Sequence, residues 1–294
     1  MGSNESKKKF EKGGLLAVPS SLLFLCLSVV PLCMLILFSF ISGNINTDGS
    51  VDAYTLGNFQ KIFAGATFSN LMIKSVLMGL LVTFLCILLA YPVAWGIAKV
   101  AKPKNRNLLA MLVIIPFFTS QLLLIYSMMV ILQSRGIIMT FLGAIGAADP
   151  STSILYSNTA VIIVLVYEYL PYMILSLYSS LEGIDDNLIH ASMSLGAGKL
   201  KTFANVVFPM SIPGLLSGIL LVLVPVTGSF VEPTLVGGPN GMMVGSLINS
   251  QFSTVLNMGY GAALSFVFLI VVSVIMAVIR LFINRTNRSI GGTI

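Results

Sequence analysis

Long apolar runs separated by short polar segments dominate the chain. A helix needs about 20 residues to cross the hydrocarbon core of a membrane, and six of the runs are at least that long. Strands of a membrane barrel would need only about 9–11 residues of alternating polarity, and these runs do not alternate. The pattern therefore predicts an all-α integral membrane protein, since helices satisfy their own backbone polar groups in lipid. The predicted spans are about 15–41, 71–98, 107–133, 159–182, 206–232 and 259–283.

Composition and charge support this interpretation and suggest an orientation. Apolar residues make up 56% of the chain and charged residues 9%, against roughly 45–50% and about 25% in soluble domains. All but three of the lysines and arginines fall in the first residues, after the second span, after the fourth span or at the C-terminal end, and the exceptions are Lys61, Lys74 and Arg135. Because basic residues favour the cytoplasmic side, we expect both termini in the cytoplasm. The net charge of +6 then reflects membrane topology and not a nucleic-acid surface.

The organisation predicted is one domain of six membrane-spanning helices, 15–284, between short cytoplasmic tails at 1–14 and 285–294. The first span follows a run of lysines, as in a signal peptide, but its apolar run is about twice the usual length, so we expect a retained anchor. The outer segments 42–70 and 234–258 are too short for a separate domain. Any ligand-binding domain outside the membrane would therefore have to belong to another chain.

No catalytic or metal-binding constellation is found in the sequence. The only histidine is His190, so neither a Ser-His-Asp triad with its usual motif nor a Cys/His metal set is expected. Cys26, Cys33 and Cys86 lie in the first two spans and resemble small apolar residues. The stretch around Gly198 approaches a phosphate-binding loop, but Leu200 stands where Ser or Thr is required. We expect no cofactor in this chain, and an ATP-driven process would need a separate ATPase.

A polar helical segment at 183–205 lies between the fourth and fifth spans. Asp185 and Asp186 are good N-cap residues, while Gly196 and Gly198 end the helix and let the chain turn back. An amphipathic helix here would suit docking onto a soluble partner. The alternative is an ordinary amphipathic loop that rests on the bilayer surface.

Ionisable residues within spans are functional hypotheses by default. Glu168 lies mid-span within Val166-Tyr-Glu-Tyr-Leu-Pro171, and a carboxylate with aromatic neighbours suits an organic cation. The aromatic neighbours are Tyr167, Tyr169 and Tyr172. A polar contact between helices, or a side chain that reaches the interface, is the alternative. Glu232 precedes Pro233 at the outer end of the fifth span, where we expect it to face an outer vestibule, either attracting cations or meeting a binding protein, and Glu182 is expected to be solvated.

Prolines within the spans predict bends that would suit a gate. They are Pro171 in the fourth span and Pro209, Pro213 and Pro225 in the fifth. A membrane-embedded enzyme or scaffold that uses Glu168 and Glu232 remains a second hypothesis. It lacks a nucleophile, a metal cluster and a second carboxylate in the same span.

The 183–205 segment resembles the "EAA" loop of ABC-importer permeases. Ala191, Gly196, Val206, Phe208 and Pro209 stand at the matching positions, while His190 replaces the usual Glu and Ser192 the usual Ala. Other stretches are similar to the spermidine/putrescine permease family, first-permease type. They are Leu89-Ala-Tyr-Pro-Val-Ala-Trp, Leu170-Pro-Tyr-Met-Ile-Leu-Ser-Leu, Phe208-Pro-Met-Ser-Ile-Pro-Gly and Gly228-Ser-Phe-Val-Glu-Pro-Thr-Leu-Val-Gly-Gly.

The resemblance implies the type I ABC-importer permease fold with six transmembrane helices in a bacterial inner or plasma membrane. It implies a homologous second permease, two copies of an ATPase that binds ATP and Mg, and an extracytoplasmic solute-binding protein. The cargo implied is spermidine or putrescine, although cousins carry ferric iron, thiamine, opines or aminoalkylphosphonates. Contact with the ATPase is expected at 185–203, through Asp186, His190, Ala191, Ser192, Gly196, Ala197 and Lys199.

Overall fold

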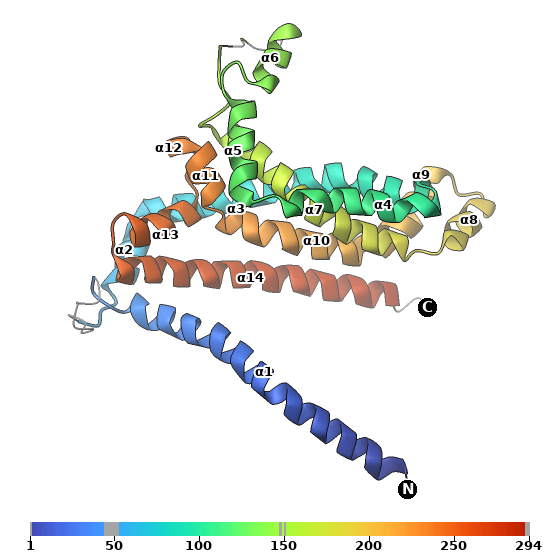
Figure 1. Ribbon diagram of the computed structural model, residues 1–294, viewed down its shortest axis with the longest axis horizontal. Coiled ribbons are helices and arrows are strands. Elements are labelled where there is room, and N and C mark those ends of the chain that lie inside the picture. The colour runs from blue at the N-terminus through green and yellow to red at the C-terminus, as the bar shows by residue number, and fades with distance from the viewer. Residues whose placement is uncertain (1, 44–52, 147–148, 150, 292–294) are drawn as a thin grey trace. The chain divides into compact units, whose positions relative to one another are not determined.

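The computed structural model describes residues 2–43, 53–146, 149 and 151–291, and these are helical almost throughout (Figure 1). Residue 1, residues 44–52 of the expected outer segment 42–70 and residues 292–294 of the expected C-terminal tail lie outside the described residues. The α-helices are α1 (Gly2–Ser39), α2 (Gly57–Ala64), α3 (Ala66–Trp95), α4 (Pro103–Ile114), α5 (Gln121–Leu132), α6 (Ile137–Ala144), α7 (Asn158–Glu182), α8 (Asp186–Ser194), α9 (Lys199–Thr202), α10 (Phe208–Gly228), α11 (Val231–Val236), α12 (Gly238–Gly241), α13 (Val244–Ser253) and α14 (Met258–Gly291). Two π-helical segments, η1 (Gly96–Val100) and η3 (Phe203–Val207), and one 3₁₀ segment, η2 (Ile115–Phe118), complete the list.

Six stretches of the described chain are long and apolar enough to span a membrane. They are Leu22–Ser39, Ala66–Val100, Gln121–Ala144, Asn158–Glu182, Lys199–Gly228 and Met258–Leu281. The number of spans agrees with the sequence prediction, and five of them overlap their predicted ranges closely. The residues expected to form tails at both ends continue the helices, because α1 begins at Gly2 and α14 ends at Gly291.

The third predicted span, 107–133, is wrong in its bounds, because the chain breaks in its middle. Helix α4 ends at Ile114, η2 contains Pro116, and α5 begins only at Gln121. Proline cannot donate the helical hydrogen bond to the residue four positions earlier, and the next residues, Thr119 and Ser120, have extended backbone angles. Helix α5 therefore turns away from the direction of α4 (Figure 1).

By their contacts, the described residues form two compact units. The first contains the described residues within 1–65 and 250–269. Within it, the end of α1 is held by Asn58, whose Nδ2 donates to the backbone oxygens of Ser39 at 3.1 Å and Ile41 at 2.8 Å. The ring of Phe59 packs against Phe40, with centroids 5.3 Å apart.

The second unit, residues 66–249 and 270–294, contains the helices that matter most for function. Helices α3, α7 and α10 run alongside one another (Figure 1) and share one apolar core. Cys86 is fully buried in this core, as expected of a small apolar residue. One polar contact also joins the helices: Tyr91 Oη on α3 lies 2.8 Å from Ser211 Oγ on α10.

Glycines set the close approach of α7 and α10. Gly214 and Gly218 are four residues apart, so they lie on one face of α10. A Cβ at Gly214 would collide with the backbone oxygen of Ser176 and the side chain of Ser180, whereas a Cβ at Gly218 would meet the sulfur of Met173. Small residues at this spacing let membrane helices approach closely. We call this contact the α7–α10 seam.

The expected proline bends lie within or beside these helices. Pro171 is inside α7, and Pro213 and Pro225 are inside α10. Pro209 lies in the first turn of α10, directly after the π-helical segment η3. Their role in a gate stays a prediction.

The α7–α10 seam makes a testable prediction about stability. Gly214→Ala should destabilise the purified protein by about 1–3 kcal/mol, because the new methyl group meets backbone that cannot move aside. Gly218→Ala should cost less, since the end of a methionine side chain is flexible. Gly96→Ala is the matched control, because nothing lies near its Cβ. Thermal unfolding in detergent measures all three, and equal melting temperatures would contradict the seam.

Candidate functional site

Two acidic side chains from different helices meet at one amide group. Gln121, the first residue of α5, donates through Nε2 to Glu168 Oε1 on α7 at 2.8 Å and to Glu232 Oε1 on α11 at 2.7 Å. An amide nitrogen carries two hydrogens, so both are used by this bridge. We call these three residues the acid pair and its bridge.

Glu232 lies deeper in the protein than the sequence suggested. We expected it to face an outer vestibule, but its side chain is only 2% exposed and accepts a hydrogen bond from Ser229 Oγ through Oε2. The reason is that α10 ends at Gly228, short of the predicted 232, and the chain folds back into the short helix α11. This turn brings the carboxylate inward to Gln121.

Glu168 keeps one oxygen free. Its side chain is half-buried, and its Oε2 is buried without a hydrogen-bond partner in the described part of the chain. Among the described residues, neither carboxylate forms an ion pair with a lysine or arginine. A buried carboxylate without a counter-charge is costly, so this place favours the approach of a cation.

Aromatic rings border the acid pair on the side of α7. Tyr172 lies one turn after Glu168, with its ring centroid 5.9 Å from that of Tyr169 and 4.5 Å from that of Phe117. Tyr167, expected in the same cluster, is 43% exposed and lies almost on the opposite face of α7 from Tyr169. Phe117, and not Tyr167, is the third ring of the cluster with Tyr169 and Tyr172.

A groove begins at these rings and continues along the surface of α7 and α10. It has a volume of about 560 Å³. Its lining residues are Phe117, Tyr172, Leu175, Ser176, Ser179, Ser180, Pro213, Gly214, Ser217 and Leu221. Four of them are serines, and none carries a formal charge. We call it the serine groove.

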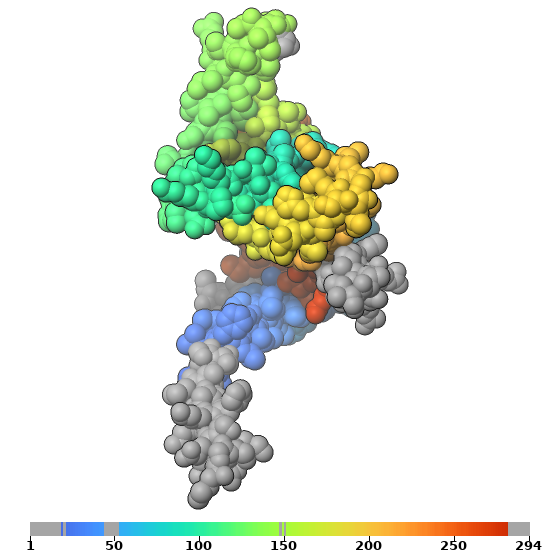
Figure 2. Space-filling view, turned by 90° about the vertical axis from the view of Figure 1, so that its right-hand side faces the viewer, coloured from blue at the N-terminus to red at the C-terminus, as the bar shows by residue number. Residues whose placement is uncertain are grey.

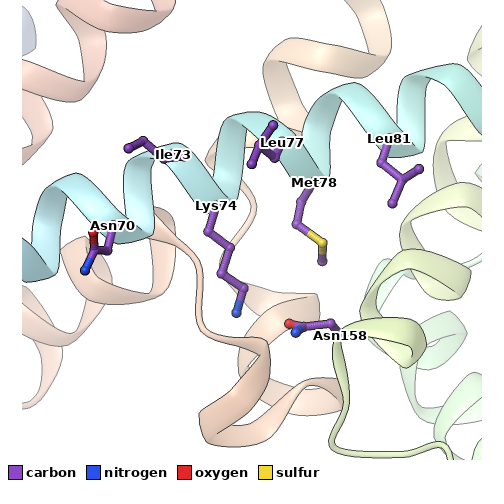
Figure 3. Close-up of a pocket in the computed structure, with 7 residues that line it drawn as sticks. All are labelled: Asn70, Ile73, Lys74, Leu77, Met78, Leu81 and Asn158. Atoms are coloured by element: carbon purple, nitrogen blue, oxygen red, sulfur yellow. The ribbon is translucent and has the colours of Figure 1, made fainter.

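A second hollow lies on α3, near the start of α7, and has a volume of about 370 Å³ (Figure 3). Lys74 lines it, and its Nζ donates to the backbone oxygen of Asn240 at 2.6 Å. The other lining residues are mostly apolar, apart from Asn70 and Asn158. A hollow whose only charge is positive does not suit a cationic ligand.

The expected docking segment forms a short helix at the other end of this unit. Asp185 caps α8 by accepting a hydrogen bond from the backbone N–H of Asn187 at 2.9 Å. Lys99, in η1 directly after α3, donates through Nζ to the backbone oxygen of Ile184 at 2.5 Å and to Asp186 Oδ1 at 2.7 Å. In Figure 2 this segment, in yellow, lies beside the blue-green residues around position 100.

The Lys99–Asp186 pair depends on pH in a defined direction. The hydrogen bond from Lys99 lowers the pKa of Asp186 below its ordinary value. The pair is therefore fully formed above the ordinary carboxyl pKa, and its contribution is lost as the pH falls through the lowered value. At neutral pH, α8 is anchored to η1, the segment that follows α3.

The exposed side of the docking segment carries apolar side chains, and its turn is formed by a glycine with no side chain. Leu195 is 89% exposed and Leu200 is 82% exposed. Gly196 has φ +84° with open space around its Cβ position, a conformation that favours glycine. An apolar surface at a glycine turn is well suited to close contact with another protein.

The seven residues expected to meet the ATPase divide into two groups. Asp186, His190, Ala191, Gly196 and Lys199 are exposed. Ser192 and Ala197 are half-buried and hold the segment together: Ser192 Oγ lies 3.1 Å from Thr202 Oγ1, and the Ala197 N–H donates to the Ser192 backbone oxygen at 3.2 Å. Ser192 and Ala197 hold the segment in its shape, and the five exposed residues form its surface.

Sequence reasoning missed Gln121, Phe117, Ser229 and Lys99. Gln121 was visible as a polar side chain inside the apolar stretch 107–133, a position that demands a polar partner. The others carry no comparable signal, because a phenylalanine in a span, a serine at a turn and a lysine at a span end are all ordinary.

These features define a transport subunit of a membrane assembly, with a bundle of spans, an acid pair, a groove and one exposed docking segment. Residues 57–290 match the family described as "Binding-protein-dependent transport system inner membrane component". The chain belongs to this family and is therefore an inner-membrane transport component, as predicted from its sequence.

Similar proteins and structures agree with the family. The chain is 37% identical over 235 residues, 80% of this chain and 83% of the relative, to the Escherichia coli protein named "Spermidine/putrescine transport system permease protein PotB". It is 36% identical over 283 residues, 95% of each chain, to the Haemophilus influenzae protein of the same name. A bacterial ABC transporter involved in alginate import shares the fold, with a TM-score of 0.73 at 16% identity, covering 96% of this chain and 98% of the other.

The docking segment predicts a separation of folding from coupling. Gly196→Asp should abolish transport and uncouple ATP hydrolysis from it, because a carboxylate at the turn blocks close contact, while melting temperature changes little. Gly196→Asn is the matched control, since Asn tolerates the left-handed conformation and adds no charge. Transport and ATPase activity in liposomes measure the effect, and normal transport by the Asp variant would refute the docking assignment.

Proposed function

We propose that the chain is one of two homologous permeases of an ATP-binding-cassette importer and forms half of the path for a small organic cation, spermidine or putrescine. The acid pair is the observation that carries this proposal. Two carboxylates meet inside a membrane bundle, and in the described residues neither has a cationic partner. The names of the relatives at 36–37% identity support the same cargo.

The remaining parts of the machine would be separate chains. Residues 185–203 would dock one subunit of a dimeric ATPase, which binds ATP and Mg, and the second permease would dock the other. An extracytoplasmic binding protein would deliver the cargo to the opposite side. With the docking segment in the cytoplasm, both termini would also be cytoplasmic, in agreement with the positions of the lysines and arginines.

The second hypothesis, an enzyme or scaffold, has one feature in its favour. The acid pair brings together two carboxylates that the sequence had placed in different spans. Both carboxylates are bonded to the same amide, however. Membership in a transport family also favours a transport path and not a reaction centre. Transport is therefore the function that we propose.

Purified components in liposomes test the proposal directly. The complete set, this chain with a sister permease, ATPase and binding protein, should accumulate labelled spermidine or putrescine only when ATP is present. Ferric iron, thiamine and an aminoalkylphosphonate serve as competing cargoes. Uptake of one of these compounds in place of a polyamine would refute the proposed cargo, while the assignment to the transport family would stand.

The acid pair predicts the effect of removing charge. Glu168→Gln and Glu232→Gln should each lower polyamine uptake by roughly tenfold or more, since hydrogen bonds to charged groups contribute about 1.5–3 kcal/mol and about 1.4 kcal/mol corresponds to a decade. Because Glu232 is buried, its variant should be neither milder than the Glu168 variant nor more dependent on salt. Basal ATPase activity should be unchanged.

Glu182→Gln is the control for this pair of variants. Its carboxylate lies on α7 at the cytoplasmic end expected from the topology, is exposed and accepts a hydrogen bond from Tyr178. Its uptake should equal that of the parent. If Glu168→Gln also transports like the parent, the acid pair is structural and the cation path loses its support within this chain.

The proposal also predicts the assembly. The described residues of one copy supply six spans and would form half of a path, so the active complex should contain one copy each of two different permeases. Expression without the sister gene should yield no ATP-driven uptake. A fully active transporter purified with this permease alone, its composition measured by native mass spectrometry, would refute the heterodimer.

A further inference from the structure

The serine groove continues the path from the acid pair towards the docking segment. Its aromatic end is formed by Phe117, four residues before Gln121, and by Tyr172, four residues after Glu168. Residues four apart on a helix share a face, so the groove and the acid pair lie on the same side of α7. From Tyr172 to Ser180 the groove follows α7 for about 12 Å, at about 1.5 Å per residue.

Two of its serines have their protons turned away from the groove. Ser176 Oγ donates to the backbone oxygen of Gly214 at 2.8 Å, and Ser217 Oγ donates to the backbone oxygen of Pro213 at 2.9 Å. A hydroxyl has one proton and two lone pairs. Once the proton is committed to a carbonyl, the oxygen offers only acceptor positions to anything in the groove.

We propose that the serine groove selects cargo by charge sign, and that it is the track along which the ammonium groups of a linear alkylamine move inward from the acid pair. This inference rests on the proposed function and adds the specificity-determining residues Ser176 and Ser217. An ammonium group brings only donors, which match committed acceptors. A carboxylate or phosphonate brings only acceptors, so it cannot form hydrogen bonds with these two oxygens.

The absence of charge among the lining residues suits a track better than a storage site. A formal negative charge would hold a polycation tightly, whereas conduction needs binding that is favourable on entry and weak enough for release. The methylene segments of the cargo would lie against Leu175 and Leu221, and the rings of Phe117 and Tyr172 offer their faces to a cation at the outer end.

Alanine variants test the committed acceptors. Ser176→Ala with Ser217→Ala should lower spermidine uptake about tenfold at subsaturating cargo, as expected when acceptors for a charged donor are lost. Ser217→Thr keeps the hydroxyl and should retain uptake. The matched control is Ser127→Ala on α5, whose Oγ donates to the carbonyl four residues earlier at 2.8 Å, in the same way as Ser217.

A labelling experiment gives a second readout that does not depend on turnover. Ser217→Cys should react with a small cationic thiol reagent, and spermidine should slow that reaction severalfold, whereas Ser127→Cys should be unaffected by spermidine. The native cysteines are replaced by alanine in both proteins. Protection at Ser217→Cys with no protection at Ser127→Cys is the expected result.

The outcomes separate this inference from the proposed function. If the parent assembly transports polyamines and the double alanine variant equals it, or the Ser127 control falls equally, the serine groove is not the track and the proposed function stands. If Ser217→Cys is not protected by spermidine, the inference is likewise overturned. If the parent assembly moves no polyamine at all, the proposed function fails and this inference fails with it.

Discussion

A polar group inside the hydrocarbon core must find its partner within the protein, because lipid offers none. This constraint organises the second unit. The Gln121 amide nitrogen would be unsatisfied alone, but Glu168 and Glu232 each accept one hydrogen bond from it. The same rule places Tyr91 against Ser211 and directs Ser75 Oγ to accept from the backbone N–H of Val244 at 2.8 Å. The polar contacts therefore fix the helices in one register, whereas apolar packing alone would allow several.

Among the described residues, the one buried side-chain atom that escapes this rule is the most informative for function. Glu168 Oε2 is buried without a partner in the described residues, although the helix has Tyr169 and Tyr172 close by. Groups left unsatisfied at a cost are found where a ligand completes the contact. A transport protein benefits from such a site only when binding is temporary, and the uncharged groove beyond it meets that requirement.

Hydrophobic length was enough to predict the number of spans, because each run is decided by local composition. It failed at 107–133, where apolar residues continue on both sides of Pro116 and hydrophobic length alone does not show that the helix ends there. The docking segment was predictable from its acidic cap and its glycines, which act locally. The position of Glu232 was not predictable, because it depends on the chain turning after Gly228 and on a partner more than a hundred residues earlier. The contacts that define the site join distant parts of the chain, and no local pattern records them.

The α7–α10 seam has a mechanical meaning. With Gly214 against the backbone of Ser176, and Ser176 in turn bonded to the Gly214 carbonyl, the two helices are held in backbone contact at this point. Both walls of the serine groove then belong to one stiff element, and the groove cannot open or shut by parting its own walls. The groove can then change the side of the bilayer to which it is open only if α7 and α10 tilt together as one rigid body. They would tilt against the part of the assembly that packs opposite them within the membrane.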